Sequence, residues 1–197
     1  MKHTLLSAVI AGFVGSAAFA GSPDPYVEVE PVYMPPIEVE TGADWEGFYA
    51  GGMAGIQSGE IAPIALQFDG TSYGGFAGYN FQSGKMVYGV EVAAQTGTVD
   101  LAPPALDLNY MIDAKARVGY AAGDALFFAS GGYTTSSTDI FGGFDASGWN
   151  VGAGLDYAVT EKFFLGGEYT YRNLPNTNFP ALDASSHGGQ VRAGIRF

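Results

Sequence analysis

The chain has 197 residues, of which 47% are hydrophobic and only 14% are charged, and its formal net charge is −12. This composition excludes a chain that is disordered throughout and disfavours an ordinary cytosolic domain, because soluble domains carry about 25% charged residues to cover their surface. The absence of cysteine excludes disulfides and thiolate metal sites, and the acidic balance argues against nucleic acid, whose phosphates need a basic surface.

The first twenty residues have the pattern of a targeting segment. A short polar start is followed by an uncharged apolar run from Leu5 to Ala20, which ends in the sequence Ala-Phe-Ala. This ending is the small-x-small pattern that signal peptidase reads, and the run of about 16 residues is shorter than the roughly 20 residues of a membrane-spanning helix. We therefore expect residues 1–20 to be a cleaved signal peptide and the protein to be exported.

Residues 21–44 form a second region, rich in proline and acid. They contain half of the 10 prolines of the chain and six carboxylates, but no lysine or arginine. Because proline donates no backbone hydrogen bond and the carboxylates repel one another, we expect an extended, disordered tether, which at about 3.1 Å per residue would reach roughly 70 Å. The alternative is that its acids fold back onto Arg192 and Arg196 of the following domain.

Residues 45–197 change to glycine, aromatic residues and side chains that alternate with a period of two. In residues 86–95, for example, Val90 and Val92 share one face and Glu91 lies on the other. Such alternation predicts strands, whose successive side chains point to opposite faces. Eight segments of about 9 to 12 residues, the length of a tilted membrane strand, are expected at 46–57, 73–81, 86–95, 110–120, 127–135, 149–157, 163–172 and 190–197. The first is too rich in glycine for its faces to be assigned.

The connections between these segments alternate between short and long. Tight turns are expected at 82–85, 121–124 and 160–162, and longer loops at 58–71, 98–107, 136–146 and 173–186. Short turns at one end and long loops at the other are the layout of an outer-membrane barrel.

The apolar face must point either to lipid or to a buried core. A soluble eight-stranded barrel or sandwich would bury it and would need many charged residues on its other face. Here that other face holds mostly small residues and a few charges, which suits a narrow lumen. Aromatic residues near both ends of the apolar face predict two girdles at the membrane interfaces: Tyr73, Tyr79, Tyr110, Tyr120, Trp149 and Tyr157. The sequence therefore predicts an all-β fold, an eight-stranded antiparallel up-and-down transmembrane β-barrel.

Nine charged residues fall on the predicted lumen face. They are Glu91, Asp113, Lys115, Arg117, Asp156, Glu168, Arg172, Arg192 and Arg196, five bases against four acids. Distances along the strands from the turns place Glu91 level with Lys115, and Glu168 level with Arg192. Because a charge buried away from water persists only if it is paired, we interpret these residues as a salt-bridge network that plugs the lumen. The alternative is an ion-conducting pore, although an eight-stranded lumen is barely wide enough for its own side chains.

Four stretches resemble a known family: GGFAGYNFQSGKMVYGVEVA, AKARVGYAAGDALFFASGGYT, GWNVGAGLDYAVTEKFFLGGEYTYRN and the terminal VRAGIRF. Their order and spacing are similar to those of the small outer-membrane barrels of alphaproteobacteria, the opacity or porin-like surface-antigen family, over residues 45–197. The resemblance implies an eight-stranded barrel with its N-terminus in the periplasm and no enzyme activity. Four terminal residues resemble the signal that the barrel-assembly machinery reads: Val191, Ala193, Ile195 and Phe197.

The sequence offers little for catalysis or metal binding. Once the signal peptide is removed, His187 is the only histidine, which excludes a site with several histidines. Ser185, Ser186 and Asp183 lie close to His187, but adjacency in sequence is not the spatial geometry of a catalytic triad, and polar loop residues explain the same pattern. We therefore expect no catalytic site, no cofactor and no metal.

We expect a protein of the cell outer membrane that serves envelope integrity or contact with a surface or host. The competing function is a small-solute, porin-like channel. Expected partners are outer-membrane lipid and lipopolysaccharide, the barrel-assembly machinery and, through the N-terminal tether, peptidoglycan. The acidic loops indicate an ordinary acidic surface, with divalent-cation bridging to lipopolysaccharide or an apolar adhesive patch as alternatives.

Overall fold

The computed structural model describes residues 42–100, 106–139, 143–178 and 182–197. The predicted signal peptide (1–20) and residues 21–41 of the predicted tether lie outside the described residues. Among the described residues there is no helix that is long and apolar enough to cross a membrane.

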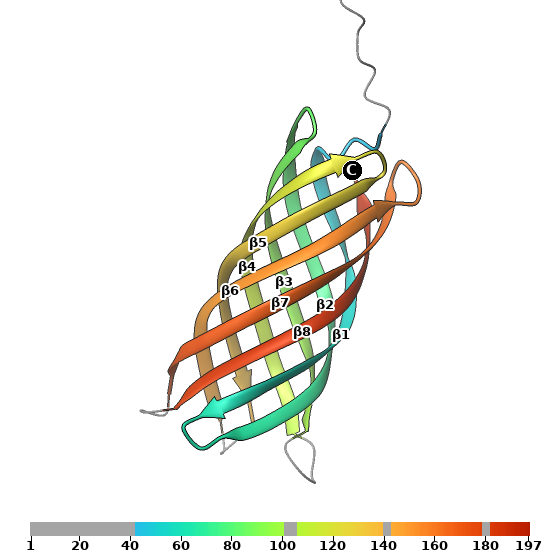
Figure 1. Ribbon diagram of the computed structural model, residues 1–197. Coiled ribbons are helices and arrows are strands. Elements are labelled where there is room, and N and C mark those ends of the chain that lie inside the picture. The colour runs from blue at the N-terminus through green and yellow to red at the C-terminus, as the bar shows by residue number, and fades with distance from the viewer. Residues whose placement is uncertain (1–41, 101–105, 140–142, 179–181) are drawn as a thin grey trace, which may run out of the picture. The chain divides into compact units, whose positions relative to one another are not determined.

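Eight strands form one closed antiparallel barrel (Figure 1). In chain order they are β1 (Gly47–Ala62), β2 (Leu66–Ser83), β3 (Met86–Asp100), β4 (Leu106–Ala122), β5 (Ala125–Thr138), β6 (Phe144–Ala158), β7 (Phe163–Thr177) and β8 (Asp183–Arg196). Each strand pairs with its neighbour in sequence, and β8 pairs with β1 to close the sheet. The fold class predicted from the alternation is confirmed. Closure leaves no unpaired strand edge, which is what a sheet needs in lipid.

The two ends of the barrel differ in their connections. The tight turns at 84–85, 123–124 and 159–162 lie at the end that also holds the C-terminus, here called the turn end (top of Figure 1). The opposite end, here called the loop end, holds the turn at 63–65 and the strand ends at Asp100, Leu106, Thr138, Phe144, Thr177 and Asp183. Glycines in the left-handed region, Gly84 (φ 58°) and Gly123 (φ 63°), allow two of the turns to reverse within two residues.

The strands are longer than the sequence predicted. They contain 14 to 18 residues, and the loop predicted at 58–71 shrinks to a three-residue turn. Beyond the part of the barrel that faces lipid, toward the loop end, every second residue still points inward and several of these residues are apolar. Ile61 and Leu108, for example, are almost fully buried in the lumen. The prediction failed because the outward residues of this part are polar, such as Glu60 and Asp69, and therefore resemble a loop.

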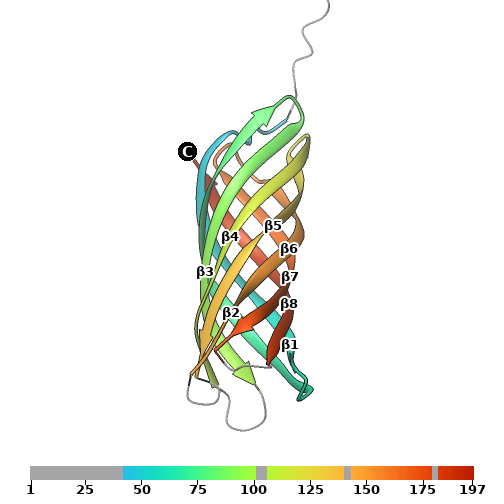
Figure 2. The same ribbon diagram turned by 90° about the vertical axis from the view of Figure 1, so that its left-hand side faces the viewer.

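The strands are steeply tilted against the barrel axis (Figure 2). A path through directly paired, outward-facing residues leads once around the barrel: Phe48, Tyr79, Val90, Ala116, Gly131, Val151, Tyr171, His187 and Ser58. It starts and ends in β1, but it returns ten residues further along that strand. Such a stagger goes with a strand tilt of about 40° and with a narrow interior that side chains can fill.

The outer face of the barrel is apolar between two aromatic girdles. Aliphatic side chains such as Val92, Val118 and Leu165 are exposed between them. The turn-end girdle comprises Phe48, Tyr79, Phe81, Tyr88, Tyr120, Phe127, Tyr157, Phe163 and Phe197. The loop-end girdle comprises Tyr73, Tyr110, Tyr133, Trp149, Tyr169 and Tyr171. The outward direction of the apolar face and the two girdles agree with the prediction of a membrane barrel.

Glycines opposite phenylalanines shape the interior. Four lumen phenylalanines each pair directly with a glycine of a neighbouring strand: Phe68 with Gly59, Phe76 with Gly51, Phe128 with Gly154 and Phe164 with Gly194. A methyl group built on Gly154 would lie 2.5 Å from the Phe128 ring and 2.5 Å from the backbone oxygen of Gly167, so this position has room only for glycine. This pairing accounts for part of the high glycine content, which obscured the faces of β1 in the sequence.

Candidate functional site in the barrel lumen

A cluster of charged side chains fills the middle of the lumen. Its members are inward-facing residues of β3, β4, β6, β7 and β8, because alternate positions of a strand point to the same side. Four acids and four bases are at most 6% exposed: Glu91, Asp113, Asp156, Glu168, Lys115, Arg117, Arg172 and Arg192. Their formal charges cancel, so the cluster needs no counter-ion from solvent.

Six of these residues form a closed ring of alternating charge, here called the charge ring. In order they are Glu91, Arg117, Asp156, Arg192, Glu168 and Lys115, with Lys115 joined back to Glu91. The N and O atoms of successive members lie 2.8 to 3.3 Å apart. Arg192 also reaches across the ring, where its Nη2 lies 2.5 Å from Oε2 of Glu91. Every charge in the ring therefore has at least two partners of opposite sign.

Neutral side chains supply further hydrogen bonds to the charge ring. The hydroxyl of Tyr49 donates to Glu91 at 3.0 Å and accepts from Nη1 of Arg117 at 2.9 Å. Ser130 and Gln190 each donate to Glu168 at 3.0 Å. Buried ion pairs are stabilised when additional hydrogen bonds satisfy their remaining acceptors and donors, and these groups do so for Glu91, Arg117 and Glu168. Oδ1 of Asp156 and Nε of Arg192 have only their mutual ion-pair contact at 3.3 Å.

The remaining acid and base, Asp113 and Arg172, form a separate pair nearer the loop end. Two nitrogens of Arg172 bind the two carboxylate oxygens of Asp113, Nε at 3.1 Å and Nη2 at 2.6 Å. The Thr134 hydroxyl donates to the same carboxylate at 2.6 Å. This two-pronged geometry fixes the orientation of both side chains as well as their distance.

Aromatic rings support the guanidinium groups of the charge ring, and sequence reasoning missed them. The guanidinium carbon of Arg117 lies 3.8 Å from the ring centroid of Phe128, and that of Arg192 lies 4.1 Å from the centroid of Phe76. A cation over a ring face is attracted by about 0.5 to 2 kcal/mol. The signal was present, since both phenylalanines occupy the lumen phase, but they lie in the two strands whose alternation is least regular.

Arg196, predicted as part of the lumen network, lies apart from it. Within the described residues, no carboxylate lies within ion-pair distance of Arg196, and its guanidinium donates to the backbone carbonyls of Asp44, Thr160 and Glu161. It also lies 4.6 Å from the ring centroid of Trp45, which is 2% exposed. The contact with Asp44 uses its backbone oxygen, whereas the alternative considered for the acidic segment required its carboxylates.

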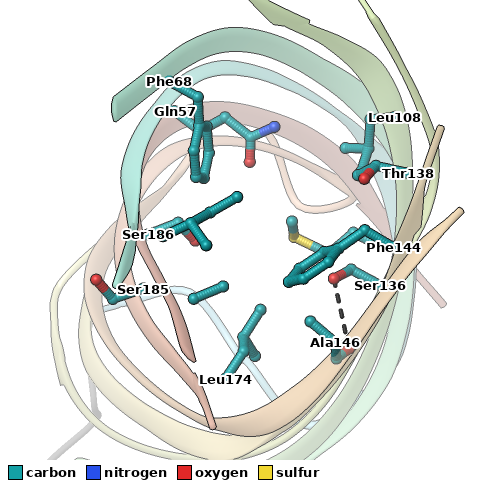
Figure 3. Close-up of a pocket in the computed structure, with 13 residues that line it drawn as sticks. Gln57, Phe68, Leu108, Ser136, Thr138, Phe144, Ala146, Leu174, Ser185 and Ser186 are labelled. Carbon is teal, nitrogen blue, oxygen red and sulfur yellow. Dashed lines mark hydrogen bonds between the residues drawn. The ribbon is translucent and has the colours of Figure 1, made fainter. Parts of the chain in front are cut away.

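An apolar cluster occupies the lumen at the loop end. Its buried members are Leu108, Met111, Phe144, Ala146, Leu174 and Ala184. Figure 3 shows the side chains of Leu108, Phe144 and Leu174 pointing from the wall toward the middle, around a cavity of about 40 Å³. A cavity of this size has room for only a few water molecules. The lumen is therefore narrow beyond the charge ring as well.

The serine and histidine residues considered for catalysis do not form a triad. Ser186 is buried in the lumen, whereas His187 points outward, because neighbours in a strand face opposite sides. Asp183 and Ser185 share the outward side with His187, but the imidazole makes its hydrogen bonds to residues of other strands. The imidazole of His187 contacts two hydroxyls on the outer wall, Ser58 Oγ at 3.0 Å from Nε2 and the Tyr169 hydroxyl at 3.2 Å from Nδ1. In the part of the chain that the structure describes, no group of three or more histidine and acidic residues is placed to hold a metal ion.

Three residues of the predicted assembly signal lie on the outer face of β8, and the fourth, Phe197, follows its last residue. Val191 and Phe197 are 69% and 75% exposed, Ala193 is exposed, and Ile195 is half-buried. The backbone nitrogen of Phe197 donates to the carbonyl of Phe48 at 2.9 Å. The C-terminal residue thus takes part in closing the barrel against β1.

A closed eight-stranded barrel with a lipid-facing apolar wall, two aromatic girdles and a packed, charged lumen defines the class of outer-membrane β-barrels. Residues 6–197 match the family model described as outer membrane protein beta-barrel domain, and the chain belongs to this family. The resemblance drawn from the sequence motifs is confirmed, and the protein resides in the outer membrane.

Relatives and solved structures agree with this assignment. The chain is 31% identical over 185 residues to the 25 kDa outer-membrane immunogenic protein of Brucella canis, covering 89% of this chain and 85% of that protein. It is 29% identical over 159 residues to the 22 kDa outer membrane protein of Rhizobium leguminosarum bv. viciae, covering 75% and 72% of the two chains. The crystal structure of Neisserial surface protein A superposes with a TM-score of 0.58 at 21% identity, over 77% of this chain and 98% of that one, which shows the shared fold.

Proposed function

We propose that this protein is a non-catalytic structural component of the outer membrane, with a plugged lumen and with its loop end at the cell surface. The charge ring carries this proposal, because all eight strands contribute side chains to it or to its immediate partners. Those strands that lack a ring member supply Tyr49 from β1, Phe76 from β2 and Ser130 from β5. A core that ties every strand to its neighbours gives a rigid barrel, as a role in envelope integrity requires.

The chain also covers the turn end of the lumen with its own residues 42–46. The backbone nitrogen of Trp45 donates to Gln82 at 2.8 Å, and that of Ala43 donates to the carbonyl of Gly123 at 3.2 Å. Together with the contact between Trp45 and Arg196, these bonds hold a large ring across the opening. They support a plugged lumen in addition to the charge ring.

We assign a proposed partner to each exposed region of the barrel. The Brucella relatives are named outer-membrane immunogenic proteins, and we extend to this chain an exposure of its loop end at the cell surface. Its loop end would contact lipopolysaccharide, and its C-terminal residues 191–197 would be read by the assembly machinery. Peptidoglycan would be reached by residues 21–41, which lie outside the described residues.

The competing function is a small-solute channel, and single-channel recording of refolded protein in planar bilayers separates the two. We expect no steady conductance from the unaltered chain. Glu91→Ala, which removes the acid shared by three bases, should produce intermittent openings, whereas Glu60→Ala at the exposed loop end should not. A steady pore of porin size in the unaltered protein would contradict the plugged lumen and favour the channel.

A further inference from the structure

His187 lies at the centre of a polar patch on the outer wall of the barrel. Its imidazole is held on both sides by the hydrogen bonds to Ser58 and Tyr169, and it packs edge-on against the Tyr169 ring with 6.2 Å between centroids. The three residues come from the adjacent strands β1, β8 and β7. None of them faces the lumen, so the charge ring does not explain their arrangement.

This patch lies directly beyond the loop-end girdle. His187 is paired with Tyr171 of that girdle on one side and with Ser58 on the other, and Ser58 is paired in turn with Asp69. Toward the loops, the next outward residue of β1 is Glu60. Because tyrosine and tryptophan girdles mark the membrane interface, the patch lies at the height of the lipid headgroups.

Two open hollows flank the imidazole of His187. One, of about 500 Å³, is also bounded by Glu60, Gln67 and Ser185, and the other, of about 490 Å³, by Thr71 and Asp100. Both hollows share the same four lining side chains, Ser58, Asp69, Tyr169 and His187. Ligand sites in proteins commonly occupy about 300 to 1,000 Å³, so each hollow can hold one ring-sized group.

The lining suits a hydroxyl-rich group better than a bare anion. Carboxylates, an amide and hydroxyls offer many acceptors and donors, and the tyrosine ring offers a surface for the apolar face of a sugar. Within the described residues, neither hollow is lined by lysine or arginine, and the carboxylates would repel a phosphate. We propose that this patch binds an uncharged sugar of an outer-leaflet glycolipid, a sugar of lipopolysaccharide that carries no phosphate. The proposal deepens the proposed function and rests on its surface-facing loop end.

The experiment uses the full chain refolded in neutral detergent with ¹³C-labelled histidine. The His187 signal is identified by its loss in the variant His187→Asn. Rough lipopolysaccharide is expected to shift this signal at concentrations at which phosphatidylglycerol, an anionic lipid without a sugar, leaves it unchanged. The shift should persist in EDTA, since it depends on sugar hydroxyls and not on a bridging cation.

Matched variants assign the binding to the patch. Ser58→Ala and Tyr169→Phe each remove one hydrogen bond to the imidazole and should weaken lipopolysaccharide binding about three- to tenfold. Tyr133→Phe is the control, because Tyr133 makes an equivalent outward hydrogen bond to Ser147 (3.0 Å) but lines neither hollow. It should bind like the unaltered chain, and all variants should retain heat-modifiable migration as evidence of folding.

Four results would overturn the proposal. They are an equal shift with phosphatidylglycerol, loss of the shift in EDTA, equal weakening by Tyr133→Phe, and release of fatty acid that depends on Ser58. The last would mean that Ser58 and His187 act as a nucleophile and its base. A failed sugar site would leave the surface labelling described below unchanged, so it is distinguishable from a failure of the proposed function.

Discussion

Glu91 is the residue on which the lumen depends most. Its carboxylate contacts Lys115, Arg117 and Arg192, and it accepts a further hydrogen bond from Tyr49. Two contacts come from β4 and one from β8, which is 101 residues away in sequence. The Glu91 carboxylate therefore links its own strand, β3, to β1, β4 and β8.

Replacing Glu91 with alanine should destabilise the barrel strongly. The change leaves three cations around an uncharged site, and breaking a buried pair costs roughly 3–5 kcal/mol, or less where water enters. Urea unfolding in detergent, followed by the loss of heat-modifiable migration, should show a lower midpoint. Glu60→Ala, which removes an exposed carboxylate, is the control and should leave the midpoint in place. Equal midpoints for Glu91→Ala and the unaltered chain would mean that the lumen carboxylates are solvated.

At the scale of strands, phenylalanines of the lumen lie opposite glycines of the neighbouring strands. Phe128 in β5 fits only because Gly154 in β6 lies opposite, and the same ring then supports the guanidinium of Arg117. The position of the Arg117 guanidinium thus depends on a glycine, because the glycine leaves room for the ring that supports it.

Gly154→Ala should therefore disturb the charge ring without touching a charge. The added methyl group would lie 2.5 Å from the Phe128 ring and 2.5 Å from the backbone oxygen of Gly167, and overpacking of this kind costs about 1–3 kcal/mol. Gly131→Ala in β5 is the control, since its methyl group would meet its nearest neighbour at 3.7 Å. Thermal or urea unfolding should separate the two variants, and identical midpoints would show that the Phe128 ring and the neighbouring backbone both shift to make room for the methyl group.

The sequence predicted correctly which side of each strand faces lipid and which faces the lumen, but it did not predict where the strands end. The alternation of residues such as Val90, Glu91 and Val92 predicts the strand, its lipid side and its lumen side. Successive side chains of a strand point to only two faces, so assigning one face also assigns the other. The strand ends were missed because outward polar residues such as Asp69 look alike in a loop and in a strand above the membrane. Glycine pairing could not be seen at all, since it depends on which residues of neighbouring strands lie opposite each other.

The number of residues between each charged residue and the nearest turn nevertheless predicted two of the observed ion pairs. Glu91 and Lys115 are directly paired residues of β3 and β4, and their side chains are in contact at 3.0 Å. Glu168 and Arg192 are in contact at 3.0 Å as well. Arg117 and Asp156 were not matched in this way, because β4 and β6 are not neighbours and their contact crosses the lumen.

For the whole molecule, the orientation of the barrel is testable because the chain has no cysteine. A single cysteine at Ile64, exposed at the loop end, should react with a membrane-impermeant maleimide on intact cells. A single cysteine at Glu161, exposed in the turn at 159–162, should react only after the outer membrane is opened. Labelling of both sites on intact cells would show a damaged envelope, and the reverse pattern would place the turn end at the surface.

The charge ring also bears on the order of events during insertion. Its six members come from β3, β4, β6, β7 and β8, so a partly built sheet cannot complete it. Until β8 arrives, Glu91, Asp156 and Glu168 lack their shared partner Arg192, and unmatched charges in a lipid environment are costly. A barrel without β8 is thus destabilised twice, by the open edges of its sheet and by unpaired charges in its interior. Pairing of the lumen charges therefore stabilises the closed barrel relative to a sheet that lacks β8.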